Sequence, residues 1–294
     1  MTADDGRSRP LPLSVAIVCR NNEGTIGRTL ESVRGLASEI VAVDSGSVDG
    51  TTGLLESAGA RVIRSAWLGH VKTKQSALEA CTQPWVLCLD SDESVERELA
   101  DSIRAALGGD PDGARTQGYE LNRVVWYRGR ALRHAWQPEW RLRLVRRGAA
   151  AWGGMDPHDT LSLTSGGRPA RLRGTLRHDS FQTFAEHLGK QLAYARLSAE
   201  GMRREGRRGS YVRLALSPAG ALLKQLVVKS AWRDGYPGWL AAGTTAAGAL
   251  MKHMILLELE HGETIPGESS APHGHRRAVA GEGDRAELVK SDPA

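Results

Sequence analysis

Residues 85–93 read Trp-Val-Leu-Cys-Leu-Asp-Ser-Asp-Glu, so five apolar residues are followed at once by three carboxylates within four positions. The apolar run is short and is bounded by Pro84 and by charge, which is typical of a buried parallel strand. Ligands of an open α/β sheet bind beyond the carboxyl ends of its strands, so we expect Asp90 and Asp92 to face a binding crevice. Carboxylates this close repel one another unless a cation neutralises them. The pattern therefore predicts a hard divalent cation shared with a phosphorylated substrate, most simply a nucleotide.

The same acidic cluster suits a second interpretation, the first turn of a helix. Ser94 or Asp92 would cap that helix, and the acidic side chains would interact favourably with its dipole. A helix N-terminus of this kind needs no ligand. The cluster alone does not separate the two interpretations, so the surrounding sequence has to decide between them.

The first ninety residues alternate between short apolar runs and segments with helical periodicity. Strands are expected over residues 13–19, 39–43, 61–64 and 85–89, and helices over 25–34, over 71–81 and from Asp49 or Thr51 onward. This alternation predicts an α/β fold with a doubly wound, mostly parallel sheet. The first two strands end in polar loops on the same edge as the acidic cluster, and this convergence favours a ligand site.

The sequence after Gly118 follows a different pattern. Strands are expected over residues 119–127 and 140–145 with a turn at 128–130, a long helix over 181–204, and a further helix opened by Ser217-Pro218. From His261 onward the chain is rich in Gly, Pro, Ser, Glu and Arg, which is typical of disorder. We therefore expect a disordered N-terminus (1–12), a catalytic domain (13–180), a helical region (181–260) and a disordered tail (261–294).

Composition narrows the class of protein. The 294 residues carry a net charge of +5 with an isoelectric point near 9.3, and 40% are hydrophobic. These values indicate a globular protein and allow nucleic acid, anionic lipid or phosphorylated substrates as partners. Cys19, Cys81 and Cys88 lack metal-ligand spacing, so we expect small core residues in a reducing compartment. The polar first twelve residues lack the apolar core of a signal peptide, which predicts a cytoplasmic location.

Three blocks of the sequence resemble one known family in their order and spacing. They are Leu13-Ser-Val-Ala-Ile-Val-Cys-Arg-Asn-Asn-Glu23, Ile40-Val-Ala-Val-Asp-Ser-Gly-Ser-Val-Asp-Gly-Thr51 and residues 85–93. Together they resemble the family 2 glycosyltransferases. The Asp-Ser-Gly-Ser form of the second block, with motifs over 67–78 and 134–142, is similar to the lipopolysaccharide core β-glucosyltransferases. The resemblance covers roughly residues 13–260.

The resemblance implies a GT-A fold and an enzyme that transfers a sugar from a nucleotide-diphosphate donor with inversion at the anomeric carbon. UDP, as UDP-glucose, is the nucleotide it suggests, and Mn²⁺ or Mg²⁺ is the cofactor. Asp44 matches the position that recognises the base, and Asp90 the residue near the ribose or the metal. Asp92 matches the metal ligand, and Lys74 a basic residue that faces the donor. The acceptor would be a saccharide or glycolipid of the cell envelope.

The inverting reaction also needs a base that takes the proton of the acceptor hydroxyl. The resembled subgroup carries a His-acid pair here, so Asp159 is the candidate base and His158 the residue that orients it. Asp156 is an alternative base, and Asp156-Pro157 also suits a simple turn. Arg141, in the Arg-Leu element of the subgroup, is the candidate arginine for substrate binding. Most of the other arginines between residues 123 and 147 are expected to lie on a solvated strand face.

The apolar segment 239–257 is a marginal candidate for a membrane span because Gly, Lys252 and His253 interrupt it. Basic residues lie among apolar ones from Lys224 to Lys252. This pattern suits a helix in the headgroup layer of an anionic membrane, and equally a helical cap packed on the sheet. The first interpretation predicts a peripheral protein on the cytoplasmic face of the inner membrane.

Other classes of function remain as alternatives. A basic nucleic-acid-binding protein would fit the charge, but the sequence lacks a basic helix or aromatic platform of recognised type, so nucleic acid is not an expected partner. A catalytically idle carbohydrate-binding scaffold would keep the fold, although the intact Asp44, Asp90 and Asp92 argue against it. A nucleotidyltransferase also uses an acidic site, but the Asp-Ser-Gly-Ser loop suits it less well.

Overall fold

The computed structural model describes residues 9–108, 116–155 and 158–262. Asp156, most of the N-terminal segment 1–12 and nearly all of the tail 261–294 lie outside the described residues. The described chain consists of a sheet region (residues 11–178) followed by a helical region (residues 184–261).

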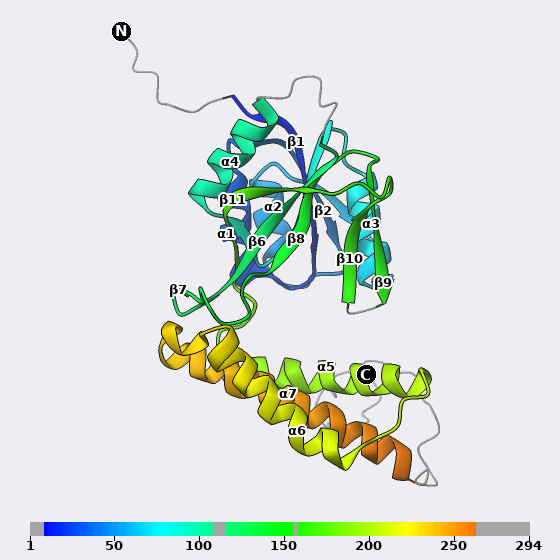
Figure 1. Cartoon of the computed structure of the whole chain (residues 1–294). Helices are drawn as coiled ribbons and strands as arrows, with labels where there is room; N and C mark the ends of the chain where they lie inside the picture. Colours follow the sequence, from blue (N-terminus) through cyan, green and yellow to red (C-terminus); the bar gives the residue numbers. More distant parts are fainter. Residues whose placement is uncertain (1–8, 109–115, 156–157, 263–294) are drawn as a thin grey trace, which may run out of the picture. The chain divides into compact units, whose positions relative to one another are not determined.

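The first half of the sheet region is a parallel α/β sheet (Figure 1). Its strands are β1 (Leu11–Cys19), β2 (Ala37–Asp44), β3 (Arg61–Arg64) and β4 (Trp85–Asp90), in the spatial order β3-β2-β1-β4. The intervening helices are α1 (Glu23–Val33), α2 (Thr51–Ser57) and α3 (His70–Glu79). All four strands and three helices predicted from the sequence are therefore confirmed, with ends that shift by one or two residues.

Both faces of the sheet are buried at its central strands, which explains why β1 and β4 are mostly apolar. Along β1, Leu13, Val15 and Ile17 enter one core cluster. The intervening Ala16 enters a second cluster, together with Val86 of β4. A strand covered on both sides in this way is the signature of a doubly wound sheet.

The second half of the sheet region mixes strand directions. Its elements are β5 (Glu93–Val95), α4 (Arg97–Gly108), β6 (Gly118–Tyr127), β7 (Arg130–Ala131), β8 (Trp140–Arg146) and β11 (Ala170–His178). Strand β8 runs antiparallel to β4 and β6, whereas β11 pairs in parallel with β6 and antiparallel with β5. Strands β9 (Ala150–Met155) and β10 (His158–Leu163) form a separate antiparallel pair.

The helix-cap interpretation of the acidic cluster is wrong. Residues after Asp92 form β5, and α4 begins only at Arg97. Glu93 lies inside the fold, where its Oε2 accepts a hydrogen bond from the backbone N–H of Asp90 at 3.1 Å. The cluster therefore forms a tight turn between two strands.

The helical region contains α5 (Phe184–Arg204), α6 (Tyr211–Leu223), a π-helical turn η1 (Lys224–Val228), a 3₁₀ turn η2 (Ala231–Asp234) and α7 (Tyr236–His261). The predicted start of a helix at Ser217-Pro218 is wrong, because Ser210 caps α6 and Pro218 lies inside it. A proline there has no N–H to donate to the carbonyl four residues earlier, and the helix continues without that bond.

A short set of polar contacts ties the helical region to the loop before β8. The Asp234 carboxylate accepts hydrogen bonds from the backbone N–H groups of Arg133, His134 and Ala135 at 2.8–3.0 Å. The Trp136 indole donates to Thr245 of α7 at 3.0 Å. The doubly wound sheet with its helical C-terminal extension confirms the GT-A type of fold that the resemblance implies. The boundary predicted at residue 180 stays a prediction.

Candidate active site

The carboxyl ends of β2 and β4 bring two predicted site residues to one edge of the sheet. Strand β1 lies between them and pairs Val18 with Asp90 and Cys19 with Asp44. Parallel pairing places these strand ends side by side. The convergence expected from the sequence is therefore present in the fold.

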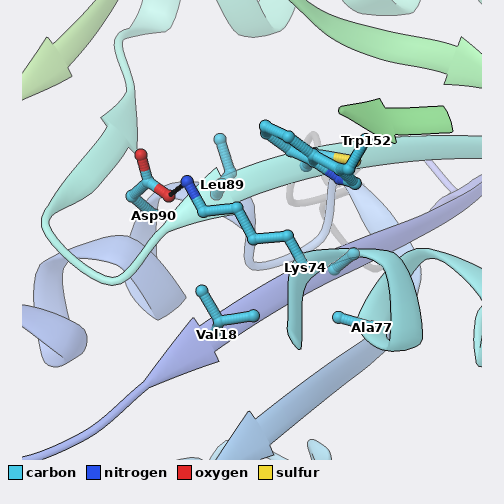
Figure 2. A pocket seen from close by; sticks show the side chains of 8 residues that line it. Val18, Lys74, Ala77, Leu89, Asp90 and Trp152 are labelled. Carbon is cyan, nitrogen blue, oxygen red and sulfur yellow. Dashed lines mark ion pairs between the residues drawn. The ribbon is translucent and has the colours of Figure 1, made fainter. Parts of the chain in front are cut away.

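Asp90 is held by two cations. Its Oδ1 lies 2.6 Å from Lys74 Nζ, and its Oδ2 lies 2.8 Å from Arg143 Nη2 (Lys74 and Asp90 in Figure 2). Burial by itself would raise the pKa of Asp90, but the charges of Arg143 and Lys74 outweigh it and hold that pKa well below its usual range. Asp90 is thus ionised and already neutralised by side chains.

Lys74 joins Asp90 to the candidate base. Its Nζ lies 2.8 Å from Asp159 Oδ2, so one ammonium bridges the ends of β4 and β10. The same nitrogen lies 4.8 Å from the centre of the Trp152 ring (Figure 2). Burial would lower the pKa of Lys74, but the charges of Asp90 and Asp159 raise it above its ordinary value. The structure therefore brings together three of the predicted residues, Lys74, Asp90 and Asp159. The side chain of His158 lies outside the described set.

Asp92 faces a histidine that the sequence did not single out. The pairing of β5 with β11 sets His178 opposite Glu93, and His178 Nε2 lies 3.5 Å from Asp92 Oδ2. Burial would raise the pKa of Asp92, but His178 lowers it overall. The other ring nitrogen, Nδ1, is buried without a hydrogen-bond partner in the described chain.

The donor set at this point fits a metal that is shared with a substrate. Among the described residues, no cluster of three His, Cys, Asp or Glu side chains forms a closed metal cage. Asp92 and His178 nevertheless offer one oxygen and one nitrogen that face each other. Mn²⁺ or Mg²⁺ bound to a nucleotide takes its remaining ligands from phosphate oxygens and water, so two protein ligands suffice.

Asp44 organises its own loop. Its carboxylate accepts hydrogen bonds from the backbone N–H groups of Gly46 at 3.1 Å and Ser47 at 3.0 Å, and it is 2% exposed. Asp49 Oδ1 accepts a hydrogen bond from the backbone N–H of Thr51 at 3.1 Å, just before α2, whose N-cap residue is Gly50. Asp44 lies at the same sheet edge as Asp90 but contacts neither Lys74 nor Arg143 in the described structure.

The arginines of this region divide into two groups. Arg141 is exposed and pairs with Glu139 at 2.8 Å, on the rim of the site. Arg143, two residues along β8, is buried and pairs with Glu93 as well as Asp90, both at 2.8 Å. Arg123 of β6 also reaches Glu93, at 3.2 Å. The expected solvated face holds for most of these arginines, but Arg143 and Arg123 lie inside.

One open cavity of about 1400 Å³, which also reaches the helical region, is bordered by most of these residues: Lys74, Asp90, Asp92, Arg123, Arg141, Arg143, Trp152, Asp159 and His178. Sequence reasoning missed Arg143, His178 and Trp152 there. A signal existed for Arg143, because Leu142, Leu144 and Val145 enclose it in an apolar strand. No local signal marked His178, which reaches Asp92 only through the pairing of β11 with β5.

Comparison with known proteins identifies the relatives of this chain. The model of the family described as Glycosyl transferase family 2 matches residues 14–163. The lipopolysaccharide core biosynthesis glycosyltransferase LpsC of Rhizobium meliloti is 31% identical over 252 residues, which cover 82% of this chain and 90% of LpsC. An uncharacterized glycosyltransferase of Rickettsia typhi is 26% identical, with 84% and 87% of the two chains covered.

Solved structures give a weaker likeness. Glucosyl-3-phosphoglycerate synthase of Mycobacterium tuberculosis, crystallised with Mn²⁺, UDP and glucosyl-3-phosphoglycerate, is 25% identical. The match covers 42% of this chain and 45% of the synthase, with a TM-score of 0.31. TarS of S. aureus is 20% identical, with 46% and 28% of the chains covered and a TM-score of 0.37.

Proposed function

Because the chain belongs to glycosyl transferase family 2, we propose that it transfers a sugar from a UDP-linked donor to a saccharide or glycolipid acceptor with inversion, in a metal-dependent reaction. Glucose is the proposed sugar, and assembly of the lipopolysaccharide core is the proposed setting. The resemblance to the core β-glucosyltransferases and the 31% identity to LpsC support this choice.

The observation that carries the proposal is the arrangement of charge at the end of β4. Lys74 and Arg143 neutralise Asp90, whereas Asp92 faces only a histidine among the described residues. We propose that Asp92 and His178 hold Mn²⁺ or Mg²⁺. When bound, the metal would stabilise the negative charge of the leaving diphosphate.

The chain's own residues would position the two substrates around this centre. Asp44 is the proposed partner of the nucleotide base, and Asp90 of the ribose. Lys74 adds a positive charge beside the diphosphate, where a developing negative charge is stabilised. Arg141, on the cavity rim, is the proposed further contact to substrate.

Asp159 is the proposed base, with His158 as the residue that orients it. An inverting transfer needs a carboxylate across the site from the leaving group. The Asp159 carboxylate borders the same cavity as Asp92, and Lys74 holds it at 2.8 Å. Transfer of the acceptor proton to Asp159 would let the acceptor oxygen attack the sugar carbon as the diphosphate leaves on the opposite side.

The experiment separates chemistry from donor binding. Asp159→Asn is expected to abolish UDP release from UDP-glucose in the presence of Mn²⁺ and an acceptor extract, and to leave UDP binding near normal by calorimetry. Asp101→Asn, which changes an exposed aspartate of α4 outside the cavity, is the matched control, and it should keep full transfer. Equal loss of UDP binding in Asp159→Asn would place this residue in the donor site or the fold instead.

We also propose that the helical region rests on the cytoplasmic face of the inner membrane, with anionic lipid as a partner. Within the described chain, one helix, Tyr236–His261, is long and apolar enough to cross a bilayer by length and composition, and 28% of its most apolar window is buried. Lys252 and the buried His253 interrupt the apolar run of that helix. This interruption supports a location on the membrane surface over a membrane-spanning one.

Exposed apolar stripes on two helices support this location. On α6 and η1 the stripe contains Val212, Leu216, Leu223 and Val227, each 59–67% exposed at spacings that share one helix face. On α7 it contains Trp239, Leu240, Leu250 and Met254, each 39–58% exposed. Basic residues flank α6 at both ends, which suits an anionic headgroup layer. They are Arg207 and Arg208 before the helix and Arg233 after η1.

A further inference from the structure

The cavity that holds the proposed donor site has a second wall with a different charge balance. On its sheet side, carboxylates such as Asp90 and Asp159 are balanced by cations such as Lys74 and Arg143. Its helical side carries lysines from three different elements and, among the described lining residues, no carboxylate. These lysines are Lys190 of α5, Lys224 and Lys229 at the two ends of η1, and Lys252 of α7.

Three of these lysines are not neutralised by the described part of the chain. Lys190 pairs with Glu186 at 2.9 Å, but no ion pair joins Lys224, Lys229 or Lys252 to a described carboxylate. A surface lysine is commonly solvated, so one unpaired ammonium carries little meaning. Three that border one cavity, on a wall where the described lining residues include no carboxylate, create a local positive field.

Their placement is built into the fold. The π-helical turn η1 closes with a hydrogen bond from the Lys229 N–H to the Lys224 carbonyl at 2.9 Å, which keeps these two residues on one turn. Gln225, between them, is buried and accepts a hydrogen bond from the Trp136 N–H at 3.2 Å, which ties the turn to the loop before β8. The turn is thus fixed to the sheet region.

The other polar side chains of this wall are neutral. Burial lowers the pKa of His187 to about 4, so its ring carries no charge near neutral pH. Gln191, Tyr194 and Ser198 of α5 border the same cavity and offer amide and hydroxyl groups. A wall of cationic donors mixed with neutral hydrogen-bonding groups matches a ligand that carries both phosphate and sugar hydroxyls.

We propose that Lys224, Lys229 and Lys252 form a binding site for a phosphate monoester on the saccharide acceptor, so that the enzyme selects a phosphorylated acceptor over a neutral one. This inference rests on the proposed glycosyl transfer, because it assigns the helical wall of that cavity to the acceptor. The ligand class is a phosphorylated sugar. A phospholipid headgroup offers the same phosphate chemistry from a second source.

The test keeps the donor site occupied and measures whether a phosphorylated sugar binds to the lysines of the helical wall. The full-length protein, saturated with UDP and Mn²⁺, is titrated with mannose 6-phosphate and with mannose. We expect mannose 6-phosphate to bind and mannose to bind at least about tenfold more weakly, because mannose offers no anion to the three ammonium groups. The combined change Lys224→Gln, Lys229→Gln and Lys252→Gln should weaken mannose 6-phosphate binding by about tenfold or more.

The matched control removes three positive charges of α5 outside the cavity, through Arg196→Gln, Arg203→Gln and Arg204→Gln, and should bind mannose 6-phosphate as the unchanged protein does. Failure of UDP to bind any form would refute the proposed function itself. Normal UDP binding with no mannose 6-phosphate binding, or with equal binding by the lysine variant, would overturn only the acceptor site.

Two further outcomes would assign the lysines elsewhere. A tenfold loss of UDP affinity in the lysine variant would place them at the donor diphosphate and overturn the proposal. Binding to phosphatidic acid vesicles tests whether the phosphate that the lysines bind belongs to a phospholipid headgroup. If the lysine variant lost vesicle binding but kept mannose 6-phosphate binding, the wall would recognise headgroups, and the saccharide site would be refuted.

Discussion

In the sheet region charged side chains lie inside, whereas in the helical region apolar side chains lie outside. Glu93 and Arg143 are 0% and 5% exposed and pair with each other, while α6 has no buried residue and Val228 beyond it is 75% exposed. Buried charge is costly unless paired, and exposed apolar surface is unfavourable unless covered. This difference fits the two proposals made above: an anionic donor that binds at the edge of the sheet, and a membrane surface that covers the exposed apolar side chains of the helical region.

The largest expected effect tests the buried side of this comparison. Arg143→Met is expected to lower the free energy of unfolding by about 3–5 kcal/mol, because it leaves Glu93 and Asp90 without a main partner inside the fold. Arg141→Met, two residues away on the same strand but exposed, should cost less than about 1 kcal/mol. Urea denaturation followed by circular dichroism measures both. Equal losses in the two variants would mean that Arg143 does not anchor the acidic turn.

A second change tests the exposed side. Leu216→Glu with Leu223→Glu is expected to reduce binding to phosphatidylglycerol vesicles by about tenfold or more, since it puts two carboxylates on the apolar stripe of α6. Neither residue is buried, so the stability of the protein should change little. Vesicle sedimentation measures the binding.

Leu54→Glu supplies the control for this experiment. Leu54 of α2 is also exposed, at 39%, but lies in the sheet region. The Leu54→Glu substitution should leave vesicle binding unchanged. If the α6 variant bound vesicles as well as the control, the stripe would have to face a protein partner or a second copy of the chain.

The smallest effect concerns the junction of the two regions. His187 packs against Phe181 and Trp136, with ring centres 4.4 and 5.3 Å away, and burial lowers its pKa to about 4. In the unfolded chain the His187 ring is protonated as the pH falls below about 6.5, whereas in the folded chain it is protonated only as the pH falls below about 4. Stability from this group is therefore full above pH 6.5 and falls as the pH drops toward 4.

His187→Phe removes that titration. We expect the loss of unfolding free energy between pH 7 and pH 5 to be about 1 kcal/mol smaller in this variant than in the unchanged protein. Urea denaturation at the two pH values gives the difference. An identical pH dependence in both proteins would show that the His187 ring is accessible to water.

The sequence was most informative where local pattern determines structure. The apolar runs at 13–19 and 85–89 became strands because both faces of the sheet are covered. Strand β9 was missed because Gly153 and Gly154 break its apolar run, and β11 because Leu172 and Leu176 are its only long apolar side chains. Pro218 predicted a helix start, but the cap at Ser210 and contacts around it keep the proline inside α6.

The candidate site divides in the same way. Asp90 and Asp92 were predicted because an apolar strand ends beside them. Lys74 and Asp159 were also predicted, and Lys74 forms ion pairs with both Asp90 and Asp159. Arg143 was not separated from its arginine neighbours, because burial of a charge depends on the Glu93 that enters from another strand. His178 lies 86 positions from Asp92 in the chain (178 − 92) and meets it only through β-pairing.

We propose that the edge of the sheet binds a nucleotide diphosphate through a metal held by Asp92 and His178. Calorimetric titration with UDP, with and without Mn²⁺, is the decisive measurement. We expect Mn²⁺ to strengthen UDP binding to the unchanged protein, and Asp92→Asn and His178→Gln each to remove that Mn²⁺-dependent gain while circular dichroism shows an intact fold. UDP binding that is absent with Mn²⁺, or a gain that persists in both variants, would contradict the account.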